Sequence, residues 1–280
     1  MQDISQLTTP DGTKLHVKTW APAGEPTAII VLVHGLAEHV ARYEHVANQL
    51  NAQGYLVVGC DLRGHGKSEG KRIYVHRFDA YVEDLNTVLN WVSATHAALP
   101  RFLLAHSMGT TVALHYLVSS VTTRSPALKG VVLSATALLP GDDISPLLIS
   151  ISGVVSALAP KLPTVTLNSS TISRDPEVVA DYHADPLVYN GKIPARTAGE
   201  LNRVFKYLQR EVHNIKIPLL IMHGDADQLT NPQGSALLYN TAASSDKTLK
   251  WWPGLYHEIF NEPEQQNVIN YMQQWIAQHL

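Results

Sequence analysis

Ser107 lies in a segment whose residue types and spacing could support nucleophilic chemistry. The segment Ala105-His106-Ser107-Met108-Gly109 matches the G-x-S-x-G pattern of a nucleophilic serine, except that alanine replaces the first glycine. A strand-like run precedes the serine and a helix-like run follows it, so a sharp turn would lift the hydroxyl out of a sheet. The alternative is an ordinary helix N-cap serine. Because alanine is still small enough for the turn, we interpret Ser107 as a nucleophile.

A nucleophilic serine needs a histidine and a carboxylate, which follow it along the chain in the order acid, then histidine. His257 lies in the segment GLYHEIF, directly after the last strand-like run. Asp225 and Asp227 lie in MHGDADQLTN, after the strand-like run at 218–223. The carboxylate would hold the imidazole tautomer and stabilise the imidazolium. Position alone allows either aspartate, and the other would cap the following helix or turn.

Developing negative charge on a substrate oxygen needs two backbone donors. One is expected from Met108, the residue after the nucleophile, and the other from the loop after the first parallel strand. That loop reads VHGLAEHVARY, in which Gly35 lets the backbone turn toward the site. We therefore expect the N–H groups of Leu36 and Met108 to form an oxyanion hole.

The elements that must position these residues follow an α/β pattern. Two alternating runs at 3–9 and 14–20 flank Pro-Asp-Gly and predict an N-terminal hairpin. Continuous apolar runs then recur, separated by mostly helical patterns, and predict a mostly parallel sheet of about eight strands with helices on both faces. These runs are at 28–33, 55–60, 101–106, 129–134, 218–223 and 248–253.

The stretch 137–199 is rich in proline and interrupts the alternation of strand-like and helix-like segments. This interruption predicts a helical cap inserted into a core made of 1–136 and 200–280. One apolar segment of the cap has helical spacing. Its apolar face could line an acyl-chain tunnel or make weak contact with a membrane interface, although it lacks the basic residues typical of interfacial helices. The face comprises Leu147, Leu148, Ile151, Val154, Val155 and Leu158.

Composition limits the classes of partner and compartment. The formal net charge is −3 and no basic run is present, so no nucleic-acid partner is expected. Cys60 is the single cysteine, no secretory signal is visible and no apolar run is long enough to cross a bilayer. We expect a cytoplasmic protein that acts on a small-molecule ester or lipid, while the oligomeric state is left open.

Two other kinds of site can be set aside. The segment DLRGHGKSEG contains Gly66-Lys67-Ser68, but a phosphate-binding loop needs glycine where Asp61 stands. The histidines at 34, 39 and 45 lack the pairing on one helix face that metal ligands often show. No metal or cofactor is therefore expected.

Several segments together resemble the monoacylglycerol lipase branch of the α/β-hydrolases, from about residue 10 to 275. They are HGLAEHVARY, DLRGHGKSEG, AHSMGTT, SRDPEVV, DPLV, HGDADQLT and YHEIF. The resemblance implies the α/β-hydrolase fold with a cap and a serine ester hydrolase that cleaves glycerol monoesters or medium-chain esters. It also implies that Asp227 rather than Asp225 is the acid. Glu38, Arg42, His106 and Tyr182 would then lie near the glycerol end of the pocket.

The chain departs from that family where Ala105 and Thr110 replace glycines. Phe260 also stands where some members carry a second histidine, which weakens the prediction of monoacylglycerol as substrate. A general carboxylesterase, a thioesterase or a lysophospholipase could use the same residues. The alternative outside catalysis is a hydrolase-fold binding protein, which the intact set of Ser107, Asp227 and His257 disfavours.

Overall fold

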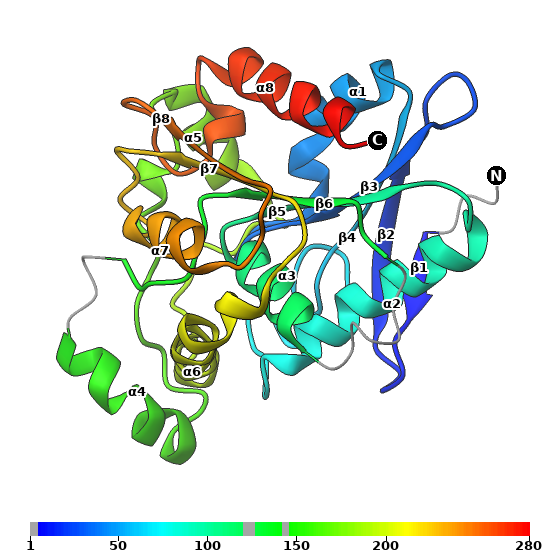
Figure 1. Ribbon diagram of the computed structural model, residues 1–280. Coiled ribbons are helices and arrows are strands. Elements are labelled where there is room, and N and C mark those ends of the chain that lie inside the picture. The colour runs from blue at the N-terminus through cyan, green and yellow to red at the C-terminus, as the bar shows by residue number, and fades with distance from the viewer. Residues whose placement is uncertain (1–4, 120–126, 142–145) are drawn as a thin grey trace.

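The computed structural model describes residues 5–119, 127–141 and 146–280, with the backbone alone for 146–151. Its centre is an eight-stranded sheet in the order β1-β2-β4-β3-β5-β6-β7-β8 (Figure 1). The strands are β1 (Gln6–Thr8), β2 (Lys14–Trp20), β3 (Ala28–Val33), β4 (Tyr55–Cys60), β5 (Arg101–His106), β6 (Gly130–Ser134), β7 (Leu219–Gly224) and β8 (Lys247–Trp252).

Strand direction follows the sequence patterns. β2 pairs antiparallel with β1 and with β4, whereas every pairing from β4 through β8 is parallel. Every residue of β3, β4, β5 and β7 is buried, as expected for parallel strands covered on both faces. β8 is half-buried along its length because it forms the edge of the sheet. The predicted α/β class and strand positions are confirmed.

Helices cover both faces of the sheet (Figure 1). On one face, α1 (Glu44–Ala52) and α8 (Gln265–Gln278) pack their apolar side chains against the strands. On the other face, the core is completed by α2 (Asp79–Thr95), α3 (Met108–Val118), α6 (Ala195–Glu211) and α7 (Gln233–Thr241). The two faces each have their own apolar core, and the sheet separates them.

Between β6 and β7 lie α4 (Pro146–Leu158), a short 3₁₀ helix (Ser169–Thr171), α5 (Pro176–Ala184) and α6. α5 begins at Pro176 after Asp175, whose carboxylate accepts a hydrogen bond from the Glu177 N–H. α6 packs on both α4 and α3. It runs from Ala195 to Glu211 and so continues across position 199, the predicted end of the cap. A Cβ on Gly199 would lie 2.5 Å from the Ser156 Cβ, so glycine allows α4 and α6 to approach closely.

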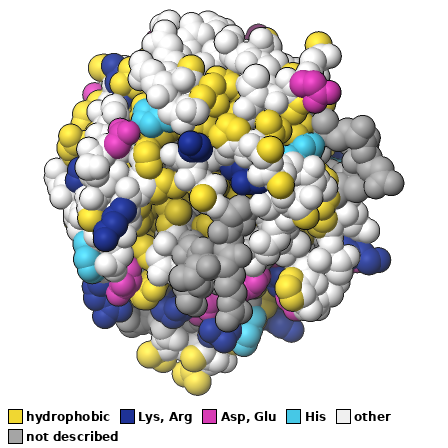
Figure 2. Space-filling model, turned by 45° about the vertical axis from the view of Figure 1, so that its right-hand side comes forward, with side chains coloured by type: hydrophobic (Ala, Val, Ile, Leu, Met, Phe, Trp, Pro, Cys, Tyr) yellow, Lys and Arg dark blue, Asp and Glu magenta, His cyan; other side chains and the backbone are white. Residues whose placement is uncertain are grey.

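The surface has no large field of one charge on the face that Figure 2 shows, where Lys and Arg are scattered among hydrophobic, acidic and uncharged side chains. Three exposed apolar side chains lie on or just after α4: Val154 is 62% exposed, Leu158 82% and Leu162 49%. The side chains of Leu147, Leu148 and Ile151, assigned above to the same helix face, lie outside the described residues. In the described part of the chain, no helix combines the length and apolarity needed to cross a membrane.

Candidate active site

Ser107 occupies a strained turn between β5 and α3. Its backbone has φ of 51° and ψ of −124°, which non-glycine residues rarely adopt. The turn is tight because α3 begins directly against the end of β3. A Cβ on Gly109 would lie 2.3 Å from the Val33 carbonyl oxygen, so only glycine fits two residues after the serine. Two residues before the serine, Ala105 is fully buried in the core, where its methyl group is accommodated.

Ser107, His257 and Asp227 lie in one hydrogen-bonded row. The Ser107 hydroxyl lies 2.9 Å from His257 Nε2, and His257 Nδ1 lies 2.8 Å from Asp227 Oδ2. Because the carboxylate can only accept, the Nδ1–H donates to it and Nε2 is left to accept the serine proton. His257 is therefore in the tautomer that a general base for Ser107 requires.

The two neighbouring aspartates have different surroundings. Asp225 is exposed, and its carboxylate accepts a hydrogen bond of 2.6 Å from the Gly254 N–H in the turn after β8. Asp227 has a fully buried side chain, and its Oδ1 accepts hydrogen bonds from the N–H groups of Leu229 and Thr230. The structure thus places Asp227 against His257 and Asp225 in a turn.

Asp227 also contacts residues that sequence reasoning missed. Its Oδ2 accepts hydrogen bonds from His223 Nε2 at 2.9 Å and from the Thr230 hydroxyl at 2.7 Å. His223 is held in turn by Ser235, 2.7 Å from its Nδ1. A histidine four residues before the acid, at the end of a strand, was the available signal in the sequence.

Charge and burial set the protonation states of the row. Burial alone would lower the pKa of His257, but the charge and hydrogen bond of Asp227 outweigh it and raise that pKa. Burial disfavours the Asp227 carboxylate, yet His257 and His223 hold its pKa well below its usual range. Burial, together with the nearby His257, lowers the pKa of His106 to about 4, so His106 stays neutral around pH 7.

The loop after β3 is oriented by hydrogen bonds to both backbone groups of Gly35. The Gly35 N–H donates to Glu38 Oε1 at 2.6 Å, and His34 Nδ1 donates to the Gly35 carbonyl at 2.7 Å. Because C=O and N–H point in opposite directions across a trans peptide, the Leu36 N–H faces away from His34. Leu36 and Met108 both line the cavity beside Ser107, where the sequence predicted them as oxyanion donors.

Residues 24–264 match the family described as serine aminopeptidase, S33. The chain belongs to this family. The monoacylglycerol lipase of Mycolicibacterium smegmatis is 42% identical over 96% of this chain and 95% of that relative. The monoglyceride lipase of Homo sapiens is 32% identical over 99% of this chain and 91% of that relative. The crystal structure of Paleococcus ferrophilus monoacylglycerol lipase has a TM-score of 0.83 and 30% identity, covering 95% of this chain and 99% of that chain.

These similarities and the eight-stranded sheet place the enzyme in the monoacylglycerol lipase branch of the α/β-hydrolases. The resemblance inferred from the motifs is confirmed. The enzyme is a carboxylic ester hydrolase of this type.

One end of the enzyme's cavity is polar, and the residues predicted there are brought together. Glu38 and Tyr182 line it, whereas Arg42 lies behind them and stacks over the Tyr182 ring at 4.7 Å from the centroid. Burial would raise the pKa of Glu38, but the Arg42 guanidinium lowers it to about 2. Arg42 also forms a two-pronged ion pair with Glu258, at 2.7 and 2.8 Å. Sequence reasoning did not single out Glu258, although it directly follows His257.

Two departures from the family pattern have structural explanations. The Thr110 hydroxyl accepts a hydrogen bond from the Ala137 N–H and donates to the Ser107 carbonyl, so this side chain ties the turn to the chain leaving β6. Phe260 is buried in the apolar core beside α8 and does not line the cavity. Glu258, two residues earlier, supplies a polar side chain to the cavity wall instead.

The rest of the cavity, which has a volume of about 220 Å³, is mostly apolar. Its walls come from the residues between β6 and β7, including the start of α6. They include Leu139, Val155, Leu167, Ile193, Leu201 and Phe205.

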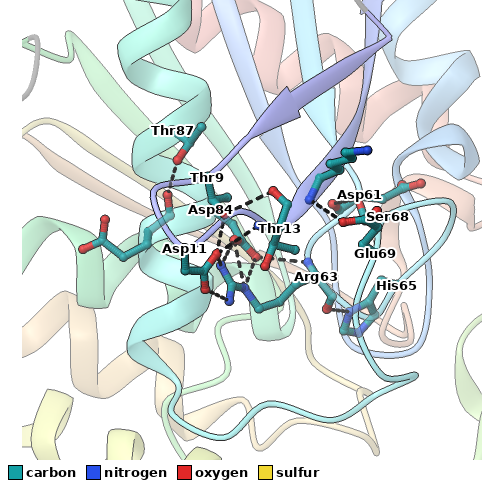
Figure 3. Close-up of polar contacts among 12 residues, drawn as sticks. Thr9, Asp11, Thr13, Asp61, Arg63, His65, Ser68, Glu69, Asp84 and Thr87 are labelled. Atoms are coloured by element: carbon teal, nitrogen blue, oxygen red, sulfur yellow. Dashed lines mark hydrogen bonds and ion pairs between the residues drawn. The ribbon is translucent and has the colours of Figure 1, made fainter.

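The segment DLRGHGKSEG is held by hydrogen bonds within the fold. Figure 3 shows Arg63 between Asp11 of the N-terminal hairpin and Asp84 of α2, with ion pairs of 2.6 and 2.7 Å. The Ser68 hydroxyl donates to the Asp61 carbonyl and accepts from the His16 N–H. These contacts anchor the loop after β4 to the hairpin. Among the residues that the structure describes, no group of three or more His, Cys, Asp or Glu side chains is placed to hold a metal ion.

Proposed function

We propose that the enzyme hydrolyses glycerol monoesters or similar medium-chain carboxylic esters through an acyl-enzyme on Ser107. The observation that carries this proposal is the hydrogen-bonded row from Ser107 through His257 to Asp227, at 2.9 and 2.8 Å, beside an apolar cavity. An apolar cavity with a polar end suits a substrate that has an acyl chain and a hydroxylated alcohol.

The reaction has two halves in this arrangement. Ser107 Oγ attacks the ester carbonyl while His257 Nε2 takes its proton, and the N–H groups of Leu36 and Met108 stabilise the oxyanion. His257 then gives the proton to the leaving alcohol oxygen, and the acyl group stays on Ser107. In the second half, His257 takes a proton from water, which attacks the acyl-enzyme and releases the acid and the serine. Asp227 keeps the imidazole oriented throughout.

The roles at the polar end follow from contacts and charge. Glu38, His106 and Tyr182 face the cavity and would contact the alcohol part of the substrate. Arg42 forms ion pairs with both Glu38 and Glu258, and it lowers the pKa of Glu38, so this buried carboxylate remains ionised next to the substrate. Neutral His106 can then donate or accept a hydrogen bond with a substrate hydroxyl.

We also propose that residues 137–199 act as a cap whose outer surface makes weak contact with a lipid interface. Val154, Leu158 and Leu162 project apolar side chains into solvent there. Co-sedimentation with phosphatidylcholine vesicles tests this contact, and Leu158→Ser should reduce binding. Equal sedimentation of both proteins would contradict it. For the cellular location we propose the cytoplasm, since the single cysteine, Cys60, is free and buried and fits a reducing compartment, and fractionation of cells tests it.

Two experiments test the catalytic proposal. A fluorophosphonate probe should label the enzyme at Ser107, and prior incubation with a monoacylglycerol should slow the labelling. A panel of glycerol monoesters, aryl esters, acyl-CoA, lysophospholipids and aminoacyl anilides should give the highest kcat/KM for the glycerol monoesters. A higher value for another class would reassign the substrate, and absence of labelling would overturn the mechanism.

A further inference from the structure

We propose that the segment Ile172–Arg174 of the cap positions the catalytic histidine, and that Arg174 and the buried Glu262 act as positioning residues for His257. The proposal rests on the proposed function, because these residues act only through His257. The observation is a set of hydrogen bonds that joins this segment to residues 258–262, together with one from the Tyr256 N–H to Glu262 on the other side of the histidine.

Backbone amides on either side of His257 are each held by a different partner. The Tyr256 N–H donates to the Glu262 carboxylate at 2.7 Å. The Glu258 N–H donates to the Ile172 carbonyl of the cap at 2.7 Å. The position of His257 along its loop therefore depends on Glu262 and on the cap.

Glu262 itself is tied to the cap. Its side chain is fully buried, and its carboxylate accepts a hydrogen bond of 3.0 Å from Arg174 Nε. The Arg174 backbone N–H lies 3.3 Å from both carboxylate oxygens, and the Arg174 guanidinium also reaches Glu264. A buried carboxylate needs such a charged partner, and here that partner comes from the cap.

A third contact completes the attachment. The Ser173 hydroxyl donates to the Asn261 carbonyl at 2.9 Å, while both Ile172 and Ser173 are buried. Ile172 also lines the substrate cavity, as does His257. The same short segment thus contacts the substrate space on one side and the histidine loop on the other.

This arrangement couples the cap to the chemical step. Displacement of residues 172–174 would remove the partner of the Glu258 amide and the charged partner of Glu262 together. The His257 ring would then no longer be held at hydrogen-bonding distance from Ser107 and Asp227. A displacement of about 1 Å at a reacting group can lower the rate about a hundredfold. The cap would therefore contribute to kcat as well as to substrate binding.

The test compares Arg174→Gln with Arg203→Gln in the full chain. Arg203 is a matched control, because it pairs with Glu200 in α6 and contacts neither His257 nor Glu262. Activity is measured with a short, water-soluble aryl ester that does not reach the apolar cavity walls. Changes in acyl-chain binding then do not affect the measured kcat and KM. For each protein, kcat, KM, Tm and the pH profile across about pH 5 to 8 are determined.

We expect Arg174→Gln to lower kcat by about tenfold, which corresponds to about 1.4 kcal/mol, with little change in KM. The acidic limb of the profile should move to lower pH, because a loosened His257–Asp227 pair no longer raises the histidine pKa as strongly. Arg174→Lys should recover part of kcat. A purely structural role would lower Tm and leave the pH profile in place.

Glu262→Gln provides a second variant, because glutamine still accepts from the Tyr256 N–H but carries no charge for Arg174. Glu262→Gln should shift the acidic limb to lower pH, as Arg174→Gln does. If a buried amide at position 262 prevents folding, Arg174→Gln alone still tests the proposal. Wild-type kcat and pH profile in Arg174→Gln would overturn the positioning role. If the wild-type enzyme neither cleaves esters nor reacts with fluorophosphonate, the proposed function itself has failed.

Discussion

The loops that carry Ser107, Asp227 and His257 contrast with the residues between β6 and β7 that line most of the rest of the cavity. In the loops, nearly every functional atom has a defined partner: Asp227 alone accepts five hydrogen bonds. Between β6 and β7, the residues that line the cavity are mostly apolar, and Leu158 of α4 is 82% exposed. Bond-making needs directional contacts that hold reacting atoms in place, whereas an acyl chain needs only non-directional apolar surface.

The contrast also predicts where substitutions are tolerated. A change of one atom in the triad loops removes a directional interaction that no neighbour can replace. A change of one methyl group in the cavity wall alters the volume available to the substrate and leaves the chemistry intact. Substitutions of both kinds, with matched controls, test this difference.

Ser107→Ala should lower kcat by about 10⁶-fold, because the nucleophile is removed while the fold is kept. Ester turnover and Tm are measured together, with Ser119→Ala at the other end of α3 as the control. Retention of a tenth of wild-type turnover by Ser107→Ala would mean that another group attacks the ester.

Asp227→Asn should lower kcat by about 10⁴-fold, because an amide favours the wrong tautomer of His257. Asp225→Asn is the matched control two residues away, and it should stay within about threefold because asparagine can still accept from the Gly254 N–H. Steady-state kinetics of both variants check the pair. The opposite ranking would assign the acid to Asp225.

The pH dependence of kcat/KM should show an acidic limb with its midpoint above about 6.5, the pKa of an ordinary histidine. His257 acts as a base only when neutral, and Asp227 raises its pKa, so activity falls as pH drops through that raised value. His106, with a pKa of about 4, titrates well below this range. A limb at or below the ordinary histidine value would show that Asp227 does not stabilise the imidazolium.

Ala198→Leu should reduce kcat/KM for long acyl chains and spare short ones, because Ala198 lines the cavity. Each methylene that the substrate can no longer bury costs about 0.8 kcal/mol, or about fourfold. Ala236→Leu, on a half-buried face of α7 that does not line the cavity, is the control. A series of esters of increasing chain length measures the effect, and equal losses at every length would show that the change acts on the triad instead.

Ala105→Gly should give the smallest effect, with kcat/KM within about threefold of the wild type. The methyl group of Ala105 is buried in the apolar core, and Ala105 does not line the cavity. Tm should fall slightly, because glycine in a strand costs about 0.5–1 kcal/mol. A larger change in kcat/KM, in either direction, would show that this methyl group shapes the turn at Ser107.

The sequence alone predicted the number and positions of the strands and their mostly parallel pairing, because buried parallel strands are continuous apolar runs. The order of the strands in the sheet came only from the structure. The sequence also pointed to Ser107 and His257, which follow the ends of strands. Glu258 and Glu262 were not found, because their partners Arg42 and Arg174 are far away in the chain. The cap boundaries of 137 and 199 stay a prediction, and α6 runs through the second of them.

By itself, the sequence determined the α/β architecture, the family and the order of the triad residues, since these depend on local patterns of polarity and on motifs. The family resemblance already favoured Asp227 over Asp225, but only the tertiary structure showed that His223 and Thr230 also hydrogen-bond to the Asp227 carboxylate. It also decided that Phe260 lies in the core and that Arg174, from the segment between β6 and β7, pairs with Glu262 in the chain that follows His257. Such contacts form between segments that are far apart in the chain. Local residue type and spacing do not show which of these segments come into contact after folding.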